Sequence, residues 1–227
     1  MNYFEYNEIV VEADGRRVLR VNILPEKSCT FNCGICPLKK AHWGTSTDFG
    51  PVEDSLKDLE QKIKELHPDV IYFRGNGEPL TNSKIEEIID FVHAKGLSVR
   101  IYSNGYLLGQ DSHMAIVSKC EEVQGCFICL NDKDFKRMHR GLEGYTAEGH
   151  IASMERFKKQ YKGKFIIKLT LLKTYNESDE MLPILKAALK RMNPDELEIE
   201  TLTYGPAAKV LAISDERIKE ITEYLQK

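Results

Sequence analysis

The chain opens on two short runs, 9–12 and 18–24, that are rich in β-branched apolar residues. Asp14-Gly15 lies between these runs and is a common pair in tight turns. Because alternating strands joined by such a pair are typical of a hairpin, the pattern predicts an antiparallel hairpin at the start of the chain.

After the hairpin, the apolar residues switch repeatedly between helical spacing and continuous β-type runs. Helices are predicted at 53–66, 82–95, 112–119, 146–161, 178–192 and 214–225, and strands at 70–73, 97–103, 123–130, 164–172 and 196–203. With the second run of the hairpin, this makes six strand-then-helix units, which indicate a parallel α/β sheet with right-handed crossovers. Because eight units close a full barrel of about 250 residues, we expect a partial (β/α)6 TIM-like barrel that is open along one side.

The composition is that of a globular protein, with 42% hydrophobic and 30% charged residues among 227. We expect one domain, in which 1–17 is an N-terminal hairpin extension and 18–227 is the barrel. The net charge of -3 argues against a protein that mainly grips phosphate backbones, and no DNA-reading element is evident. No apolar run approaches the ~20 residues of a membrane span. The first residues also lack a signal-peptide pattern, so we expect a cytoplasmic location without membrane partners.

The six cysteines are the most informative residues of the composition. Disulfide frameworks belong mainly to small secreted domains, so metal binding, catalysis or burial is favoured here. Cys126 and Cys129 lie on one predicted strand, where they point to opposite faces. We expect both of them, together with Cys120, to be core residues.

Cys29, Cys33 and Cys36 form a C-x3-C-x2-C pattern directly after the first parallel strand. Three thiolates in one loop suit an iron–sulfur cubane that keeps one iron open. Three alternatives remain: a structural zinc site with His42 as the fourth ligand, a thiol–disulfide pair that leaves Cys29 unexplained, and three unrelated buried cysteines. Because parallel α/β folds place their chemistry at the carboxyl ends of strands, this loop is where a site is expected.

This loop resembles that of the radical S-adenosylmethionine (SAM) superfamily. The resemblance implies a [4Fe-4S] cluster held by Cys29, Cys33 and Cys36, whose remaining iron binds the amine and carboxylate of SAM. It also implies that one electron, from a donor such as flavodoxin or ferredoxin, cleaves SAM to methionine and a 5′-deoxyadenosyl radical. That radical removes a hydrogen atom from the substrate, which makes the enzyme an oxidoreductase in the broad sense.

A glycine-containing turn follows the second parallel strand. Its residues are Gly75, Asn76, Gly77, Glu78 and Pro79. Taken alone, this is an ordinary strand-to-helix turn whose glycines allow close backbone approach. It resembles the GGEP motif of the superfamily, with Asn76 in place of a glycine, and this implies contact with the SAM amine.

Other candidates follow the later strands. The resemblance implies that Ser103 or Asn104 reaches the ribose of SAM, that Asn131 touches SAM, and that Lys168 meets its carboxylate. Arg140 lies in a segment similar to another SAM- or substrate-contacting stretch. The alternatives are a capped turn, a residue on the outer face of the strand and a solvated basic turn.

The residue before the third cysteine is often aromatic in this superfamily and lies near the adenine. Here it is Ile35, an aliphatic side chain that can also cover a ring face.

Two groups of the superfamily look most similar. Segments 73–79, 103–108 and 193–195 resemble the wyosine-synthase-related group, although the wyosine enzymes carry further cysteines upstream and none precedes Cys29 here. The second group is the glycyl-radical-enzyme activases.

No cysteine follows Cys129, so we expect no second cluster. An open barrel suits a protein, peptide or RNA substrate. A basic segment, 133–140, is placed near the predicted mouth. A regulatory iron–sulfur or zinc module without catalysis is the alternative of another class.

Overall fold

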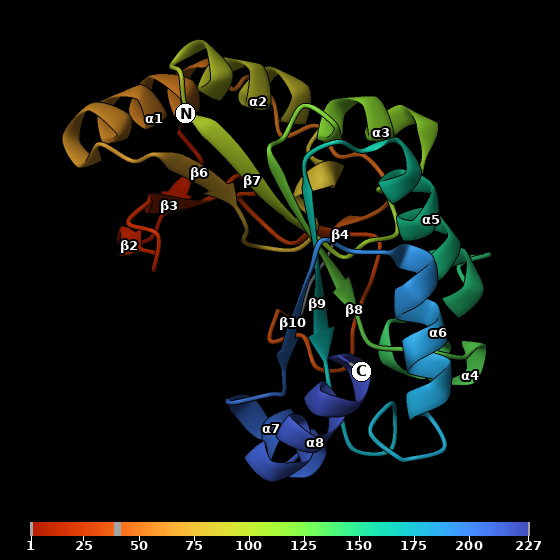
Figure 1. Ribbon diagram of the computed structural model, residues 1–227. Helices are drawn as coiled ribbons and strands as arrows, with labels where there is room; N and C mark the ends of the chain where they lie inside the picture. The colour runs from red at the N-terminus through yellow and green to blue at the C-terminus, as the bar shows by residue number, and fades with distance from the viewer. Residues whose placement is uncertain (1, 39–41, 227) are drawn as a thin grey trace.

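The computed structural model describes residues 2–38 and 42–226, and its centre is one open parallel sheet (Figure 1). The parallel strands run in the order β3 (Arg17–Asn22), β6 (Val70–Phe73), β7 (Ser98–Ser103), β8 (Glu122–Phe127), β9 (Lys164–Thr170) and β10 (Glu196–Glu200). Each neighbouring pair is parallel. Within the described residues β10 does not pair with β3, so the sheet stays open and the partial barrel is confirmed.

The N-terminal segment lines the outer edge of β3. β2 (Val10–Val11) pairs antiparallel with β3, with Val10 opposite Val18, which confirms the predicted hairpin. β1 (Glu5–Tyr6) pairs with the other end of the same strand, and a short parallel pair joins β4 (Ser28–Cys29) to β5 (His42–Trp43). β1, β4 and β5 were not predicted, because two-residue strands are too short to show a period.

The main helices follow the predicted positions and pack on the outer face of the sheet (Figure 1). They are α1 (Glu53–Leu66), α2 (Ile85–Ala94), α3 (Asp111–Val117), α5 (Ala147–Gln160), α6 (Leu182–Met192) and α8 (Asp215–Gln226). Sequence patterning did not predict α4 (Asp132–Met138), α7 (Gly205–Leu211) or the 3-10 turn Pro79–Thr81. Two turns of helix are too short for a clear hydrophobic repeat.

Local chemistry explains where several helices begin and end. The Thr146 hydroxyl accepts a hydrogen bond from the Gly149 backbone N–H at 2.9 Å, which caps α5. α1 ends at His67 in a left-handed conformation before a proline. The expected cap of α2 is displaced: Asn82 accepts from the Lys84 N–H at 2.9 Å, and the helix begins only after Lys84.

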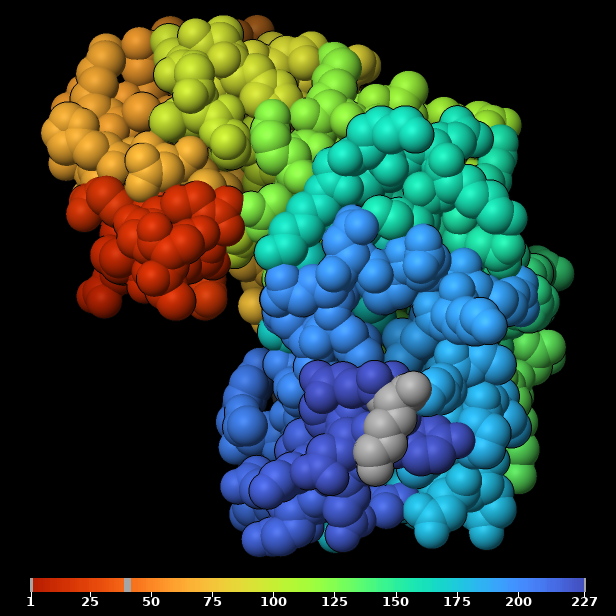
Figure 2. All heavy atoms as spheres, viewed as in Figure 1, coloured from red at the N-terminus to blue at the C-terminus, as the bar shows by residue number. Residues whose placement is uncertain are grey.

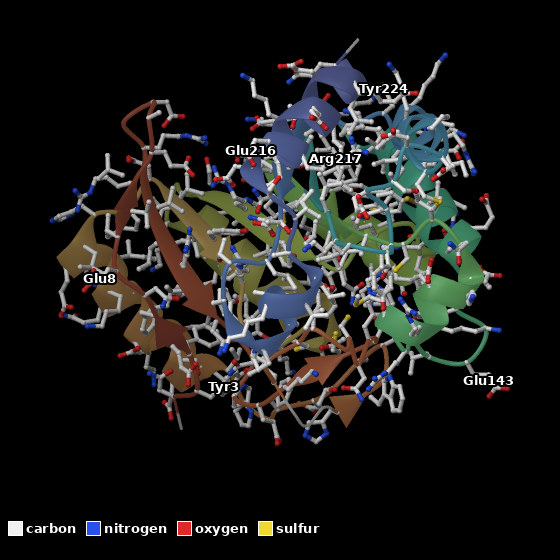
Figure 3. The ribbon with its side chains drawn as sticks, turned by 90° about the horizontal axis from the view of Figure 1, so that it is seen from below. Tyr3, Glu8, Glu143, Glu216, Arg217 and Tyr224 are labelled. Carbon is white, nitrogen blue, oxygen red and sulfur yellow. The ribbon has the colours of Figure 1, made fainter. Side chains whose placement is uncertain are left out.

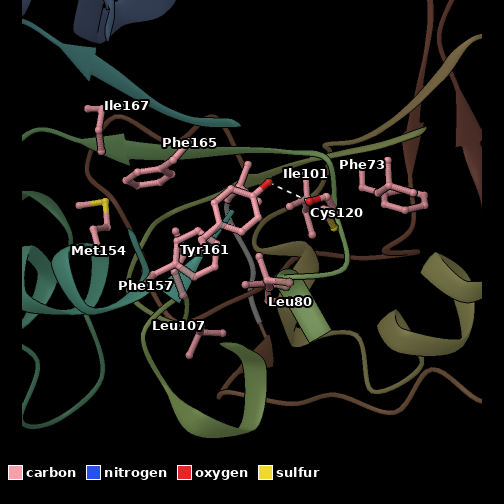
Figure 4. Packing of buried hydrophobic residues seen from close by; sticks show 14 of the residues in the cluster. Phe73, Leu80, Ile101, Leu107, Cys120, Met154, Phe157, Tyr161, Phe165 and Ile167 are labelled. Carbon is pink, nitrogen blue, oxygen red and sulfur yellow. Dashed lines mark hydrogen bonds between the residues drawn. The ribbon is translucent and has the colours of Figure 1, made fainter. Parts of the chain in front are cut away.

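The main core lies between the helices and the outer face of the sheet. Figure 4 shows Phe157, Tyr161 and Phe165 packed together there, with the Tyr161 hydroxyl donating to the Cys120 carbonyl at 2.8 Å. Cys120 is 2% exposed in this cluster and Cys129 is fully buried in a smaller one, so both are core residues as predicted. Burial of this apolar surface is the main stabilising contribution to such a fold.

The inner face of the sheet is instead rich in charge. At the amino end of the strands, Arg100 forms ion pairs with Glu12 at 2.5 Å and with Glu122 at 2.7 Å. Because Glu12 follows β2, this network ties the N-terminal hairpin to β7 and β8. The cysteine loop and the glycine turn lie at the opposite, carboxyl end of the strands.

The two ends of the chain flank the open side of the sheet. Figure 3, seen from below, places Glu8 of the N-terminal segment on one side and Arg217 and Tyr224 of α8 on the other. The Arg217 guanidinium forms an ion pair with the Asp179 carboxylate, with nitrogen and oxygen 2.6 Å apart. None of the helices in the described ranges has the length and apolar character needed to cross a bilayer.

Candidate active site

The cysteine loop is held against the glycine turn by backbone hydrogen bonds. The Ser28 N–H donates to the Asn76 carbonyl at 3.2 Å, and the Glu78 N–H donates to the Ser28 carbonyl at 2.8 Å. The Thr81 hydroxyl donates to the Ser28 hydroxyl at 2.7 Å. The loops after β3 and β6 therefore form one unit at the carboxyl ends of neighbouring strands.

Close approach explains both glycines of this turn. A Cβ on Gly77, whose φ is +121°, would lie 2.1 Å from the Ser28 carbonyl oxygen. A Cβ on Gly75 would lie 2.1 Å from the Asn22 side-chain oxygen. No side chain fits at either position, so the turn packs directly against Ser28 and Asn22, and both glycines also line the adjacent cavity.

Cys29, Cys33 and Cys36 all line one cavity of about 930 Å³. The Phe31 N–H donates to the Cys29 sulfur at 3.3 Å, and the Asn104 amide donates to it at 3.6 Å. The Cys36 N–H donates to the Cys33 carbonyl at 3.1 Å, which closes a turn between these two ligand positions. The folded loop thus directs all three predicted ligands to one space.

The far side of the cysteine loop rests on the end of α4. The Asn32 N–H donates to the His139 carbonyl at 2.8 Å, and the Gly34 N–H donates to the Met138 carbonyl at 2.7 Å. The His139 ring stacks on Phe31 with its centre 4.7 Å away, and its Nδ1 lies 3.3 Å from the Cys33 sulfur. Burial lowers the pKa of His139 to about 3, so this ring is neutral beside the thiols.

Glu78 is a buried carboxyl that connects the glycine turn to the end of β7. It accepts hydrogen bonds from the Asn104 N–H at 2.5 Å, the Ser103 hydroxyl at 3.1 Å and the Leu80 N–H at 3.2 Å. Burial raises its pKa to about 7, while these three donors act in the opposite direction. Because it is fully buried and does not line the cavity, Glu78 is a positioning residue.

Asn104 joins three elements of the site. Its side chain donates to the Thr30 hydroxyl at 2.9 Å, and its backbone carbonyl accepts a hydrogen bond from the His150 ring at 2.7 Å. Asn104 also lines the cavity. Ser103 is buried and faces Glu78. Of the two ribose candidates, Asn104 is therefore the one placed at the cavity.

Most predicted residues gather at this cavity. Those that line it are Cys29, Cys33, Ile35, Cys36, Gly75, Gly77 and Asn104. Asn76, Glu78, Pro79 and Ser103 lie next to it in the same turns. The Asn76 side chain donates to the Leu24 carbonyl at 3.2 Å, and Pro79 begins the buried 3-10 turn.

Three predicted residues have other surroundings. Asn131 is exposed and caps α4 by accepting from the Asp134 N–H at 2.9 Å. Arg140 is exposed, although a Cβ on Gly34 would lie 3.8 Å from its guanidinium. Lys168 does point into the barrel, where its ammonium lies 3.0 Å from Glu200 and 3.6 Å from Glu198. Of the basic segment 133–140, only His139 lines the cavity.

His42 does not join the cysteines. Its ring forms a 2.7 Å contact with Glu26 on the surface. No three His, Cys, Asp or Glu side chains of the described ranges converge on a point that one metal ion would occupy. His42, the fourth ligand of the zinc alternative, is engaged with Glu26 instead.

Comparison with known families decides the class of this site. A family model described as the Radical SAM superfamily matches residues 24–187, well over half of the chain. The chain belongs to the radical SAM superfamily. It is an enzyme of this superfamily, and its reaction subclass is open.

Two curated relatives are similar over 92% of this chain, each at 23% identity. One is a protein named GTPase Obg from Brachyspira hyodysenteriae, and the other is a UPF0026 protein from Helicobacter pylori. The chain spans 31% of the first relative and 69% of the second.

Solved structures show the same fold. A structure of TYW1 with a lysine-pyruvate adduct bound has a TM-score of 0.68 at 17% identity, over 92% of this chain and 72% of that one. A radical SAM methyltransferase from Sphaerobacter thermophilus has a TM-score of 0.70 at 14% identity, over 100% of this chain and 75% of that one. The predicted resemblance to the superfamily, with the wyosine-related enzymes among the similar folds, is confirmed.

The thiols of this radical SAM chain fit a cluster. The pKa of Cys33 is raised first by burial and then by the neighbouring Cys29, Cys126 and Cys36 thiols, so these sulfurs lie within electrostatic range of one another. Burial raises the pKa of Cys29 to about 11, so cluster binding must displace its proton. A cubane takes each thiolate on a different iron, and its ligands need not converge on one point. Cys29, Cys33 and Cys36 would hold it.

Sequence reasoning missed several residues of the cavity. Arg20, Arg74, Tyr102 and Cys126 line it from β3, β6, β7 and β8. Cys126 packs against the smaller hydrophobic cluster, as expected of a core residue, and it also lines the cavity. The alternation of side chains along a strand could have identified them. Arg20, Tyr102 and Cys126 alternate with apolar residues that face outward, which places these three on the inner face of their strands.

Proposed function

We propose that this chain uses a [4Fe-4S] cluster and SAM to abstract a hydrogen atom from a macromolecular substrate, a protein, peptide or RNA. The observation that carries the proposal is that Cys29, Cys33 and Cys36 line the same cavity as Gly75 and Gly77. In the superfamily these two motifs hold the cluster and the SAM amine. Here they share one space at the carboxyl ends of parallel strands.

When bound, the cluster supplies one electron that cleaves SAM to methionine and a 5′-deoxyadenosyl radical, which takes the hydrogen atom. The chain's own residues bind and orient. The turn around Gly77 offers bare backbone to the SAM amine, and Asn104 offers a side-chain amide to the ribose. Ile35 offers an apolar surface to the adenine, while Glu78 and Ser103 fix these turns from behind.

We assign no SAM contact to Asn131, Arg140 or Lys168. Asn131 caps α4, and Lys168 is bound by two glutamates. Arg140 is exposed and does not line the cavity. Among the polar side chains, this leaves Asn104 as the main candidate for the nucleoside.

The open side of the barrel supports a large substrate. Figure 2 shows the surface hollowed between the N-terminal segment, in red, and the C-terminal segment, in blue. The cavity is lined by Val10, which is 40% exposed, and Tyr204, which is 75% exposed. Apolar groups left open at the rim of a site are typical of a surface that a partner covers. A macromolecule docked there would itself keep water from the radical.

We also propose a single radical SAM domain over 18–227, preceded by the hairpin extension 1–17. A small electron carrier such as flavodoxin or ferredoxin would reduce the cluster. All six cysteines are free thiols, which favours a reducing compartment, the cytoplasm.

Anaerobic reconstitution with iron and sulfide tests the proposal. The reconstituted protein, with dithionite and SAM, should release 5′-deoxyadenosine, measured by liquid chromatography. The Cys33→Ala variant should release none. Absence of deoxyadenosine from wild-type protein that carries four irons would disprove the proposed chemistry, and gross unfolding of Cys33→Ala would indicate a structural metal site instead.

A further inference from the structure

Two arginine side chains face the interior of the cavity from adjacent strands. Arg20 lies on β3 and Arg74 directly follows β6, and both line the cavity. The register places Arg20 opposite Tyr72. Arg74 is two residues beyond Tyr72 and therefore on the same face. Long side chains at such diagonal positions are within reach of one another.

Neither arginine forms an ion pair within the described part of the chain. The Arg74 guanidinium lies 4.9 Å from the centre of the Tyr102 ring, and that of Arg20 lies 5.9 Å from the Tyr72 ring. These are cation–π distances. Arg74 also forms a side-chain hydrogen bond with Tyr72, but a guanidinium has five N–H donors, so others stay available.

The carboxylate that acts on Arg74, Glu200, is already occupied. Glu200 acts on Arg74 only at longer range, and Lys168 binds it at 3.0 Å. Arg100, which also faces the barrel interior, shows the contrast, because two glutamates pair with it. Burying half of a guanidinium without a counter-ion costs free energy. An anion bound in the cavity, supplied from outside the chain, would offset that cost.

The position of Arg20 separates this anion from the loops that would hold SAM. Arg20 lies two residues before Asn22, whose side chain accepts from the Asn76 N–H at 3.0 Å and so supports the glycine turn. Arg20 is therefore deeper in the barrel than that turn, on the parallel strand next to the N-terminal segment. Tyr6, Asn7 and Glu8 of this segment line the same cavity.

The surroundings favour one carboxylate over a polyphosphate chain. Glu8 and Glu200 also line the cavity, and they would repel a nucleic-acid backbone. The remaining cation of the lining, Lys27, is bound by the Leu38 carbonyl at 2.9 Å. Nucleic acids are gripped by many basic contacts, and two arginines among acidic neighbours do not provide them.

We propose that Arg20 and Arg74 bind a carboxylate of a protein or peptide substrate and thereby position it for hydrogen abstraction. This inference rests on the proposed function, since the substrate is that of the radical reaction. Arginine presents paired N–H donors that match the two oxygens of a carboxylate.

Residue-specific modification tests the site in the reconstituted protein. Phenylglyoxal labels accessible arginines, and peptide mass spectrometry reports each one separately. The labelling is done with excess SAM, so that the SAM carboxylate already occupies its own site. Acetyl-Gly-Glu-Gly-amide at millimolar concentration should slow the labelling of Arg20 and Arg74, and acetyl-Gly-Gln-Gly-amide should not. Arg156, an exposed arginine paired with Asp111, is the internal control.

Binding of the glutamyl peptide should weaken roughly 10- to 100-fold in Arg74→Gln and in Arg20→Gln, the loss of a charge-assisted hydrogen bond. Arg156→Gln should bind it like wild type. Equal protection by both peptides, protection by a tetrauridylate RNA but not by the glutamyl peptide, or a parallel loss of SAM binding in the variants would each overturn the assignment. Failure of the proposed function would show separately, as wild-type protein that releases no deoxyadenosine.

Discussion

The carboxylate of Glu78 accepts a hydrogen bond from the Asn104 backbone N–H at 2.5 Å, and this contact joins the turns after β6 and β7. Ser103 and Leu80 donate to the same carboxylate. A side chain that never touches the cavity thus fixes two of its walls.

Replacing Glu78 with glutamine should loosen both turns. The amide NH2 group would face backbone donors, so we expect the free energy of unfolding to fall by about 1–3 kcal/mol and SAM to bind more weakly. Urea denaturation and equilibrium dialysis with SAM measure the two effects. Glu87→Gln, an exposed change on α2, is the control. Wild-type stability and SAM affinity in Glu78→Gln would contradict the positioning role.

The cysteines should separate into ligands and non-ligands by iron content. Cys33→Ala should lose the cluster after reconstitution, while Cys126→Ala should keep about four irons per chain because three thiolates already hold a cubane. Iron analysis and absorbance spectra check this. If Cys126→Ala lost its iron as Cys33→Ala does, Cys126 would be a fourth ligand, and no iron would be left for SAM.

Acid should destabilise the protein through a buried histidine. Burial lowers the pKa of His150 to about 4 from its ordinary 6.5. Below pH 6.5 this histidine becomes protonated in the unfolded chain, while the native ring stays neutral. Its contribution to the free energy of unfolding is therefore fully present above that pH. It should fall by up to roughly 3 kcal/mol as the pH drops toward 4.

The variant His150→Gln isolates this contribution. Glutamine can still donate to the Asn104 carbonyl, which now lies 2.7 Å from the ring nitrogen, but it does not titrate. Unfolding in urea between pH 4 and 7 should therefore show a shallower dependence on pH in the variant. Identical slopes for the two proteins would rule out His150 as the source.

The ion pairs at the amino end of the barrel should matter for stability. Arg100 is 8% exposed and lies between Glu12 and Glu122. Arg100→Met leaves both carboxylates with Arg16 as their remaining partner, and we expect a loss of about 3 kcal/mol. Arg156→Met breaks an exposed pair and should cost at most about 1 kcal/mol. Equal losses in the two variants would show that burial of the Arg100 network adds nothing.

The long elements of the fold could be predicted from sequence because they carry a clear period. α1 was predicted over its full range, and the hairpin, the six parallel strands and the remaining long helices were placed within a few residues. α4 and α7 were missed because two turns of helix do not repeat. α4 mattered, since its end carries His139 to the cysteine loop.

Within the site, local patterns were predictable and pairings between strands were not. The cysteine and glycine motifs are continuous in sequence, so they could be recognised. The placement of Arg74 over Tyr102 depends on the register of β6 and β7, and the capture of Lys168 by Glu200 depends on that of β9 and β10. A single sequence does not specify those registers.

The last strand also has a consequence for assembly. β10 forms one edge of the open sheet, and Glu196, Glu198 and Glu200 alternate along its inner face. A strand from another molecule added to this edge would have to place its own side chains beside that row of carboxylates. Charged residues that point inward on an edge strand protect it from such addition. The open edge of the sheet is thereby protected against pairing with a strand of a second molecule.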